Sequence, residues 1–135
     1  MATLKTNTLT GTSTAGSIAV TGEGGSTTTN LQQGLIKAFM DLDGTGTIAL
    51  NESFNISGVT DNGTGYYTPA YTNNFGNIFY GWGGNGEFAN TDYHGRQPHC
   101  ISDYQTTSSC RIGCGINSSL EDCEHIRTGW WGDLA

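Results

Sequence analysis

The sequence predicts an all-β protein: an antiparallel β-sandwich, Ig-like or jelly-roll-like, preceded by an extended N-terminal docking segment. Glycine is abundant, with 21 of 135 residues, whereas proline occurs only 2 times. Threonine, serine and asparagine supply most of the polar positions, which is typical of strands joined by glycine turns. From residue 37 to the C-terminus, strand-like runs alternate with turn signals about every 8 to 12 residues, a spacing typical of sandwiches.

Composition divides the chain into an attachment or oligomerisation segment, residues 1–34, and a sandwich domain, residues 35–135. Residues 1–30 hold 13 Ser or Thr and 5 Gly, and residues 16–22 alternate like one short strand. Such a tract buries too little apolar surface to order alone. We expect it to pair with its own copies or to dock on a larger partner; the alternative is a flexible tail. The apolar residues expected to dock are Leu4, Leu9, Ile18 and Val20.

The connector between the two parts has two interpretations. Residues 31–40 carry apolar side chains at helical spacing, and Asn30 is a suitable N-cap. Residues 37–42 equally fit the first strand of the sandwich, with alternate apolar residues on one face. We expect a short helical or extended connector that runs into this strand.

Turn signals then separate the remaining strands. The tetrapeptide Asp43-Gly-Thr-Gly46 ends the first strand, and Asp61-Asn-Gly-Thr-Gly65 contains an Asn-Gly pair, a strong hairpin signal. The other strand-like runs are 47–50, 54–59, 66–71, 78–82, 110–116 and 125–131.

The charge distribution excludes two classes of partner. Five basic residues face twelve acidic ones, for a formal net charge of −7, and the basic residues are scattered singly. Phosphate neutralisation and anionic membrane surfaces both require clustered Lys and Arg, so we predict no nucleic-acid partner and no membrane association. The longest apolar run, residues 35–40, is too short to cross a bilayer. The N-terminus lacks the apolar core of a secretory signal, so we expect synthesis in a cytoplasm and release by another route, such as host lysis.

Several segments resemble a module of marine bacteriophage tail-fibre and virion-appendage proteins. Residues 37–65 contain its aromatic strand, Gly-Thr-Gly turn, Ser-Phe-Asn strand and Asp-Asn-Gly-Thr-Gly hairpin in order. The ending Gly129-Trp-Trp-Gly-Asp-Leu-Ala135 and the opening Ala2-Thr-Leu-Lys-Thr-Asn-Thr-Leu9 resemble the two ends of the same proteins. The chain departs from the pattern over residues 67–124, where glycine, aromatic residues and four cysteines gather.

The resemblance implies a virion component that assembles as a homotrimer or a similar oligomer, attaches to other virion proteins through its N-terminal segment and faces solvent or the host with its β domain. Host attachment to a surface glycan or protein is the leading function. The alternatives are a capsid decoration protein, for which residues 1–30 would be the clasp, and a glycan-binding surface module. Fold-level analogy does not identify a receptor.

The four cysteines leave three interpretations open. If residues 117–121 turn a hairpin, Cys114 and Cys123 meet across it and Cys100 is left to pair with Cys110, which gives two disulfides. Buried free thiols are the second interpretation. Zinc is the third, but Cys110 and Cys114 would lie about 13 Å apart on one strand. We therefore predict no metal site.

Neither a calcium site nor a catalytic site is predicted. The segment Asp41-Leu-Asp-Gly-Thr-Gly46 resembles half of a calcium loop, but the remaining ligands are misplaced, so a turn is favoured. No serine lies in a Gly-x-Ser-x-Gly context, and no two carboxylates are fixed at a useful separation. We predict no catalytic residue and no cofactor.

The glycine-rich aromatic run over residues 75–88 has two interpretations. Alternating Ile78, Tyr80 and Trp82 suit one face of a core strand, with the glycines in a loop after it. Aromatic rings beside amides and flexible turns also suit a glycan site. Trp130 and Trp131 point to opposite faces of the last strand, so one is expected in the core and the other at the surface. The candidate glycan or receptor contacts are Tyr80, Trp82, Asn85, Phe88 and Trp131.

Overall fold

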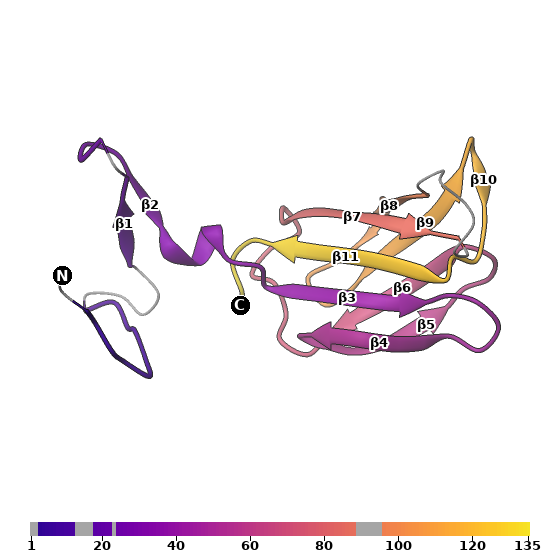
Figure 1. The fold of residues 1–135 in the computed structure, drawn as a ribbon, viewed down its shortest axis with the longest axis horizontal. Helices are drawn as coiled ribbons and strands as arrows, with labels where there is room; N and C mark the ends of the chain where they lie inside the picture. The colour runs from indigo at the N-terminus through magenta and orange to yellow at the C-terminus, as the bar shows by residue number, and fades with distance from the viewer. Residues whose placement is uncertain (1–2, 13–17, 23, 89–95) are drawn as a thin grey trace. The chain divides into compact units, whose positions relative to one another are not determined.

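The computed structural model describes residues 3–12, 18–22, 24–88 and 96–135. The chain falls into two compact units, Met1–Leu35 and Ile36–Ala135, which are drawn in Figure 1. This division lies one residue from the boundary expected from the sequence.

The N-terminal unit contains a two-stranded hairpin. Strand β1 (Ala19–Thr21) pairs antiparallel with β2 (Thr28–Asn30), inside the stretch expected to form a strand; residues 16 and 17 of that stretch lie outside the described residues. A 3-10 turn, η1 (Leu31–Gly34), follows directly. The Asn30 side chain accepts a hydrogen bond from the Gln32 amide at 2.8 Å, so the predicted N-cap is confirmed.

The second unit is a β-sandwich, as predicted from the sequence. We call its two layers the β3 sheet, in the order β4-β3-β11-β7, and the β9 sheet, in the order β10-β9-β6-β5 with β8 also paired to β9. All of these pairs are antiparallel (Figure 1). The strands are β3 (Ala38–Asp43), β4 (Ala49–Phe54), β5 (Ile56–Asp61), β6 (Tyr66–Tyr71), β7 (Gly81–Glu87), β8 (Gln97–Gln105), β9 (Cys110–Ile116), β10 (Ser119–Leu120) and β11 (His125–Trp131).

The core lies between the two sheets and is built by strict alternation. In β3, Ala38, Met40 and Leu42 are buried and face inward, as their spacing predicts, whereas the residues between them face outward. In the neighbouring strand, Trp130 is fully buried and Trp131 is 42% exposed, so the predicted division of the two tryptophans is confirmed. The core also contains an aromatic cluster formed by Tyr71, Phe75, Tyr80 and Trp130.

The predicted strand over residues 78–82 is wrong. Strand β7 begins at Gly81 and runs through the glycines, while Ile78 lies before it with 48% of its surface exposed. The physical reason is close packing, because a Cβ at Gly81 would lie 2.9 Å from Trp131 Cε2 and one at Gly86 would lie 2.6 Å from Cys114 Sγ. The glycines are therefore strand residues that make room for their neighbours.

Other boundaries also differ from expectation. The run 54–59 is divided at Asn55, whose φ of 59° separates β4 from β5 and lets the chain cross from one sheet to the other. Its amide group holds this corner by donating to Lys37 O at 2.9 Å and to Asn73 O at 3.0 Å. Strands β8 and β10 were not predicted.

Candidate functional site

The outer face of the β3 sheet carries a line of paired charges. Asp41 lies 3.0 Å from His125 Nδ1 and 3.3 Å from Arg127 Nε, and Arg127 also reaches Glu87 at 3.0 Å. Burial opposes ionisation of Asp41, but the hydrogen bond from His125 and the charges of His125 and Arg127 outweigh it and hold the pKa of this carboxyl below its usual value of 3.8. This network ties β3, β7 and β11 together.

The same face has an apolar end where β3 begins. Phe39 and Phe54 pack with ring centroids 6.2 Å apart, and Phe54 remains 53% exposed. A shallow groove of about 430 Å³ lies beside them. Its lining combines apolar residues with the edge of the charge network: Ile36, Phe39, Met40, Asp41, Glu52, Arg127, Thr128 and Gly129.

The five candidate glycan contacts lie in different surroundings. Trp131 lies on the outer face of the β3 sheet over Gly81 and Gly83. Trp82, which lies in β7 between Gly81 and Gly83, points to the inner face of the β3 sheet and packs against the core. Tyr80 is 5% exposed. It belongs to the core, so it does not face a ligand at the surface.

The other two candidates are exposed but separate. Asn85 lies opposite Arg127, four residues along β7 from the position under Trp131, a distance of about 13 Å at the usual strand rise. Phe88 follows β7 and lies under the Arg96 guanidinium at 5.2 Å. The structure therefore brings no three of the five together into one contact surface.

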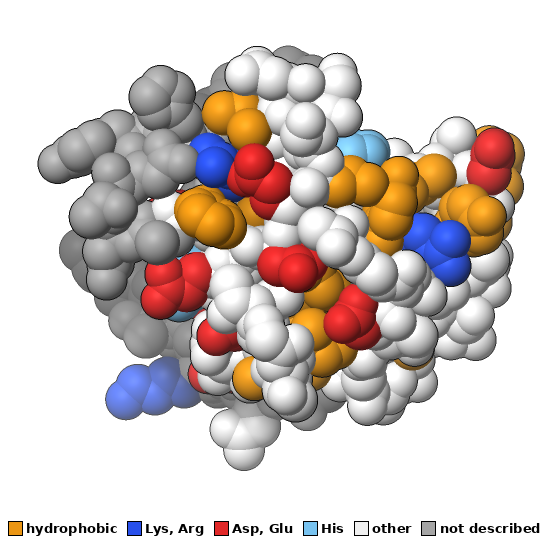
Figure 2. Space-filling view, turned by 90° about the vertical axis from the view of Figure 1, so that its right-hand side faces the viewer, with side chains coloured by type: hydrophobic (Ala, Val, Ile, Leu, Met, Phe, Trp, Pro, Cys, Tyr) orange, Lys and Arg blue, Asp and Glu red, His pale blue; other side chains and the backbone are white. Residues whose placement is uncertain are grey.

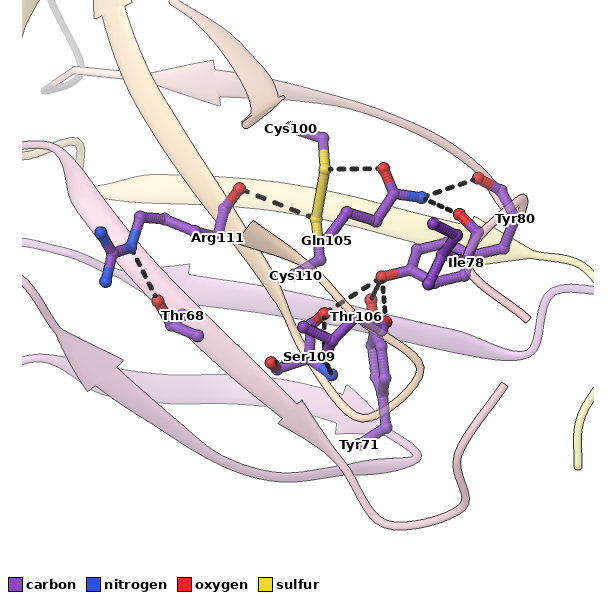
Figure 3. The surroundings of a disulfide bond; sticks show 10 residues. All are labelled: Thr68, Tyr71, Ile78, Tyr80, Cys100, Gln105, Thr106, Ser109, Cys110 and Arg111. Atoms are coloured by element: carbon purple, nitrogen blue, oxygen red, sulfur yellow. Dashed lines mark hydrogen bonds between the residues drawn. A yellow bond between two sulfur atoms is a disulfide. The ribbon is translucent and has the colours of Figure 1, made fainter. Parts of the chain in front are cut away.

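One disulfide connects strands β8 and β9. Cys100 and Cys110 are bonded, with their Cα atoms 6.6 Å apart, as the two-disulfide interpretation expects (Figure 3). Gln105, next to this bond, donates to the main-chain oxygens of Ile78 at 2.8 Å and Tyr80 at 3.3 Å. The disulfide thus stabilises the β8–β9 hairpin. Through Gln105, this hairpin contacts the backbone at Tyr80, a residue of the aromatic cluster.

Cys114 and Cys123 are adjacent thiols. Both are buried, and their sulfur atoms lie 2.7 Å apart, which agrees with the predicted proximity but not with a second disulfide. The hydrogen bond between them and their burial raise the pKa of Cys114. Among the described residues, no three His, Cys, Asp or Glu side chains form a group that could hold a metal ion.

Several acidic side chains lie on the end of the sandwich that Figure 2 faces. Three aspartates of the sandwich hold turns. Asp43 accepts from the Thr45 amide at 2.8 Å, Asp61 from the Gly63 amide at 2.9 Å, and Asp122 from the Gly65 amide at 2.7 Å. The segment that resembled a calcium loop is thus a turn stabilised by Asp43, while Asp41 belongs to the charge network.

A hollow on the outer face of the β9 sheet was missed by the sequence reasoning. It has a volume of about 460 Å³ and lies around Gly115, between the rings of Tyr66 and His99 and the tip of the β9–β10 hairpin. We call it the β9 hollow. Glycine at the alternate positions 113 and 115 was the signal that could have indicated it, because glycines on one face of a strand often mark a close approach of neighbouring groups or a ligand to the backbone. Its lining residues are Tyr66, Gln97, Pro98, His99, Gly115, Asn117, Ser118, Ser119 and Leu120.

Searches against protein-family models, curated proteins and solved structures found no match to this chain. Within the described residues there is no helix with the length and apolar character needed to span a membrane.

Proposed function

We propose that this chain is a structural protein of a bacteriophage particle, an oligomeric fibre or appendage that contributes to host attachment. The resemblance of residues 37–65 and of both ends of the chain to virion-appendage modules supports this function. The architecture is compatible with it, since a small exposed unit precedes a sandwich whose strands are extensively paired.

The exposure of the N-terminal unit is the observation that carries the proposal. No described residue of this unit is buried, and Leu4 and Leu9 are 78% and 57% exposed. An isolated two-stranded hairpin is at best marginally stable in water. Burial of each leucine on a partner would contribute about 1.5–3 kcal/mol. We propose that the partner is another virion protein, and that Leu4, Leu9, Ile18 and Val20 make the contact.

The apolar end of the β3 sheet supports the oligomeric part of the proposal. The groove there begins at Ile36, the first residue after the N-terminal unit, and its neighbours Phe54 and Trp131 are 53% and 42% exposed. Copies attached side by side through their N-terminal units would be able to cover this surface, as in the homotrimer that the resemblance implies. A Phe54→Ser variant should then lose its trimer in sedimentation, whereas Ser57→Ala, at an exposed position of β5, should keep it.

Attachment is tested by replacing docking residues. In particles that carry Leu9→Asn, we expect less of the chain to sediment with the virion, because an apolar contact is lost. Thr8→Asn changes an exposed neighbour of similar size and should leave the amount unchanged. Equal retention of both variants and of a chain lacking residues 1–35 would contradict the docking role.

Location separates the fibre from the decoration protein. Electron microscopy of particles labelled at the C-terminus should show the label on the tail or another appendage. A label spread over the shell would instead support a capsid decoration protein with the N-terminal unit as its clasp. A signal on uninfected cells alone would overturn both versions.

A further inference from the structure

One end of the β9 hollow is formed by two aromatic rings that lie over a glycine of β9. Gly113 lies between two rings, and a Cβ added there would be 2.7 Å from His99 Nε2 and 3.2 Å from Tyr66 Cε1. The absence of a side chain at this position lets both rings lie over the strand and form one end of the hollow. A Cβ added at Gly115, two residues along, would meet the backbone of Ser119 and lie 2.9 Å from Leu120 Cα, so the glycine lets the β9–β10 hairpin lie close against β9 beside the hollow.

The opposite end of the hollow is a hairpin tip with strained backbone. Ile116 pairs with Ser119, and the two residues between them, Asn117 and Ser118, have φ values of 49° and 69°. Glycine adopts this region at no steric cost, whereas a serine there costs about 1 kcal/mol or more. The chain nevertheless keeps a polar side chain at each position, and both side chains line the hollow.

Most polar side chains that line the hollow are not hydrogen-bonded within the described part of the protein. Within the described residues, the side chains of Gln97, His99, Asn117, Ser118 and Ser119 make no hydrogen bond to the rest of the protein. Each is therefore available to a ligand without breaking an existing bond.

The chemistry of the lining selects one class of ligand. Among the described residues that line it there is no Lys, Arg, Asp or Glu, so a phosphorylated or carboxylated ligand would find no opposite charge from such groups there. A fully apolar ligand would leave the amides and hydroxyls unpaired, which is unfavourable. A neutral, polyhydroxylated ring satisfies both requirements, because its hydroxyls pair with amide and hydroxyl side chains while its C–H face packs on an aromatic ring.

We propose that the β9 hollow binds a neutral saccharide, with a pyranose ring against Tyr66 and His99 and its hydroxyls hydrogen-bonded by Gln97, Asn117 and the serines of the hairpin tip. The volume of about 460 Å³ lies within the range of small-ligand sites. In an attachment protein this site would contact a glycan of the host surface, which deepens the proposed function. Saccharide binding is measured on the isolated chain, without the particle. A negative result would therefore contradict the saccharide site without contradicting the role in the virion, and a failed virion assay would leave the saccharide site standing.

Amide NMR spectra of the full chain, titrated with maltose, cellobiose, lactose and α-1,2-mannobiose, test the site. We expect at least one of these neutral disaccharides to shift the amide signals of Gln97, His99 and residues 113–119, with a dissociation constant of about 1 mM. Glucuronic acid, a charged comparison, should bind more weakly. If none of the four moves these signals at about 50 mM, or if glucuronic acid binds more tightly, the inference is overturned.

Matched variants locate the binding. Tyr66→Ala and His99→Ala should each weaken the binding about ten-fold, through the loss of ring contact. Tyr104→Ala removes a tyrosine side chain from β8 outside the hollow, where the Tyr104 ring centroid lies 3.9 Å from Arg111 Cζ. This variant should bind the saccharide like the unaltered chain. His99 is exposed, so its variant tests the inference even if Tyr66→Ala fails to fold. Unchanged binding by His99→Ala, or an equal loss in Tyr104→Ala, would contradict the proposed site.

Discussion

Thr128 places a hydroxyl in the sandwich core. Thr128 is 4% exposed, and its Oγ1 is, with Trp130 Nε1, one of two buried side-chain polar atoms that have no hydrogen-bond partner among the described residues. Its methyl group packs where a Cβ at Gly84 would lie, 2.7 Å from Thr128 Cγ2. The side chain thus combines useful packing with an unfavourable desolvated hydroxyl.

Replacement of this hydroxyl should stabilise the protein. Thr128→Val keeps the shape of the side chain and removes the unpaired group, so we expect the free energy of unfolding to rise by about 1 kcal/mol and the melting temperature by about 4–8 °C. Thr128→Ser is the matched control, because it keeps the hydroxyl and loses the methyl, and it should lower both quantities. Calorimetry of the two variants measures the difference; a less stable valine variant would show that Oγ1 is satisfied after all.

Asp41 should make stability depend on pH in the acidic range. Its pKa is lower in the folded chain than the usual 3.8, so the ionised form stabilises the fold above that value. This contribution is lost as the pH falls through the folded pKa, below about 4. We expect urea midpoints to be similar at about pH 7 and pH 5 and lower at about pH 3, with a smaller drop for Asp41→Asn. Asp103→Asn alters a carboxylate that makes no ion pair within the described part of the chain, and should behave like the unaltered protein.

At the scale of elements, β7 depends on its glycines for its place beside β11. Gly84 lies against the backbone of Arg127 and Thr128, and an added Cβ would lie 3.0 Å from Thr128 Cα, where no side-chain rotation can relieve the clash. We expect Gly84→Ala to lower the free energy of unfolding by about 1–3 kcal/mol or more. Gly58→Ala, in a strand of the other sheet with no atom within 4 Å of its new methyl, should be neutral or slightly stabilising. Chemical unfolding compares the two, and equal effects would contradict the packing argument.

The β8–β9 hairpin should depend on its disulfide. The bond closes a loop with a sequence separation of 10, for which the entropy of the unfolded chain predicts a stabilisation of about 3 kcal/mol. We expect the double variant Cys100→Ser, Cys110→Ser to lose about this much, whereas Cys114→Ser leaves the bond intact. Alkylation of the denatured, unreduced protein followed by peptide mass measurement should label Cys114 and Cys123 and not the other two. Labelling of none of the four would indicate that a second bond, between Cys114 and Cys123, has formed.

The elements that the sequence predicted well are those with local signals. Strands β6, β9 and β11 were predicted at their observed bounds, because apolar alternation and flanking glycine or Asn-Gly turns define them without reference to the rest of the chain. Strand β8 was missed because it is polar and contains Pro98, which an edge strand tolerates. The glycines of β7 favour a loop by propensity, and the strand forms through pairing with β11, which is distant in sequence.

The same distinction explains the candidate sites. The proximity of Cys114 and Cys123 was predictable because one hairpin brings them together. The β9 hollow was not predictable, because its lining comes from β6, β8, β9, β10 and the β9–β10 turn. The sequence of one strand does not identify the strands that lie beside it in a sheet. Aromatic residues drew attention to residues 75–88, but Tyr80 and Trp82 face the core.

At the scale of the whole molecule, the first and last strands of the sandwich, β3 and β11, pair with each other. The last strand, β11, lies between β3 and β7, and the Lys37 amide, just before β3, donates to Trp130 O at 2.8 Å. The C-terminal residues continue this closure, since the Gly76 amide donates to Asp133 O and the Ala135 amide to Asn74 O. The β3 sheet is therefore held together by contacts between residues that are distant in sequence, a topology that generally slows folding.

Residues 36–135 should consequently fold without the N-terminal unit. All buried residues that form the hydrophobic core belong to this unit, and it includes both strands that close the sandwich. We expect the isolated fragment to melt within about 2 °C of the full chain, because the removed hairpin buries none of that core. The matched control, residues 36–124, lacks β11 and should not fold, since β3 and β7 lose the strand between them. Thermal unfolding followed by circular dichroism measures both; a large loss of stability in the 36–135 fragment would mean that the N-terminal unit supports the sandwich instead of serving only as an attachment segment.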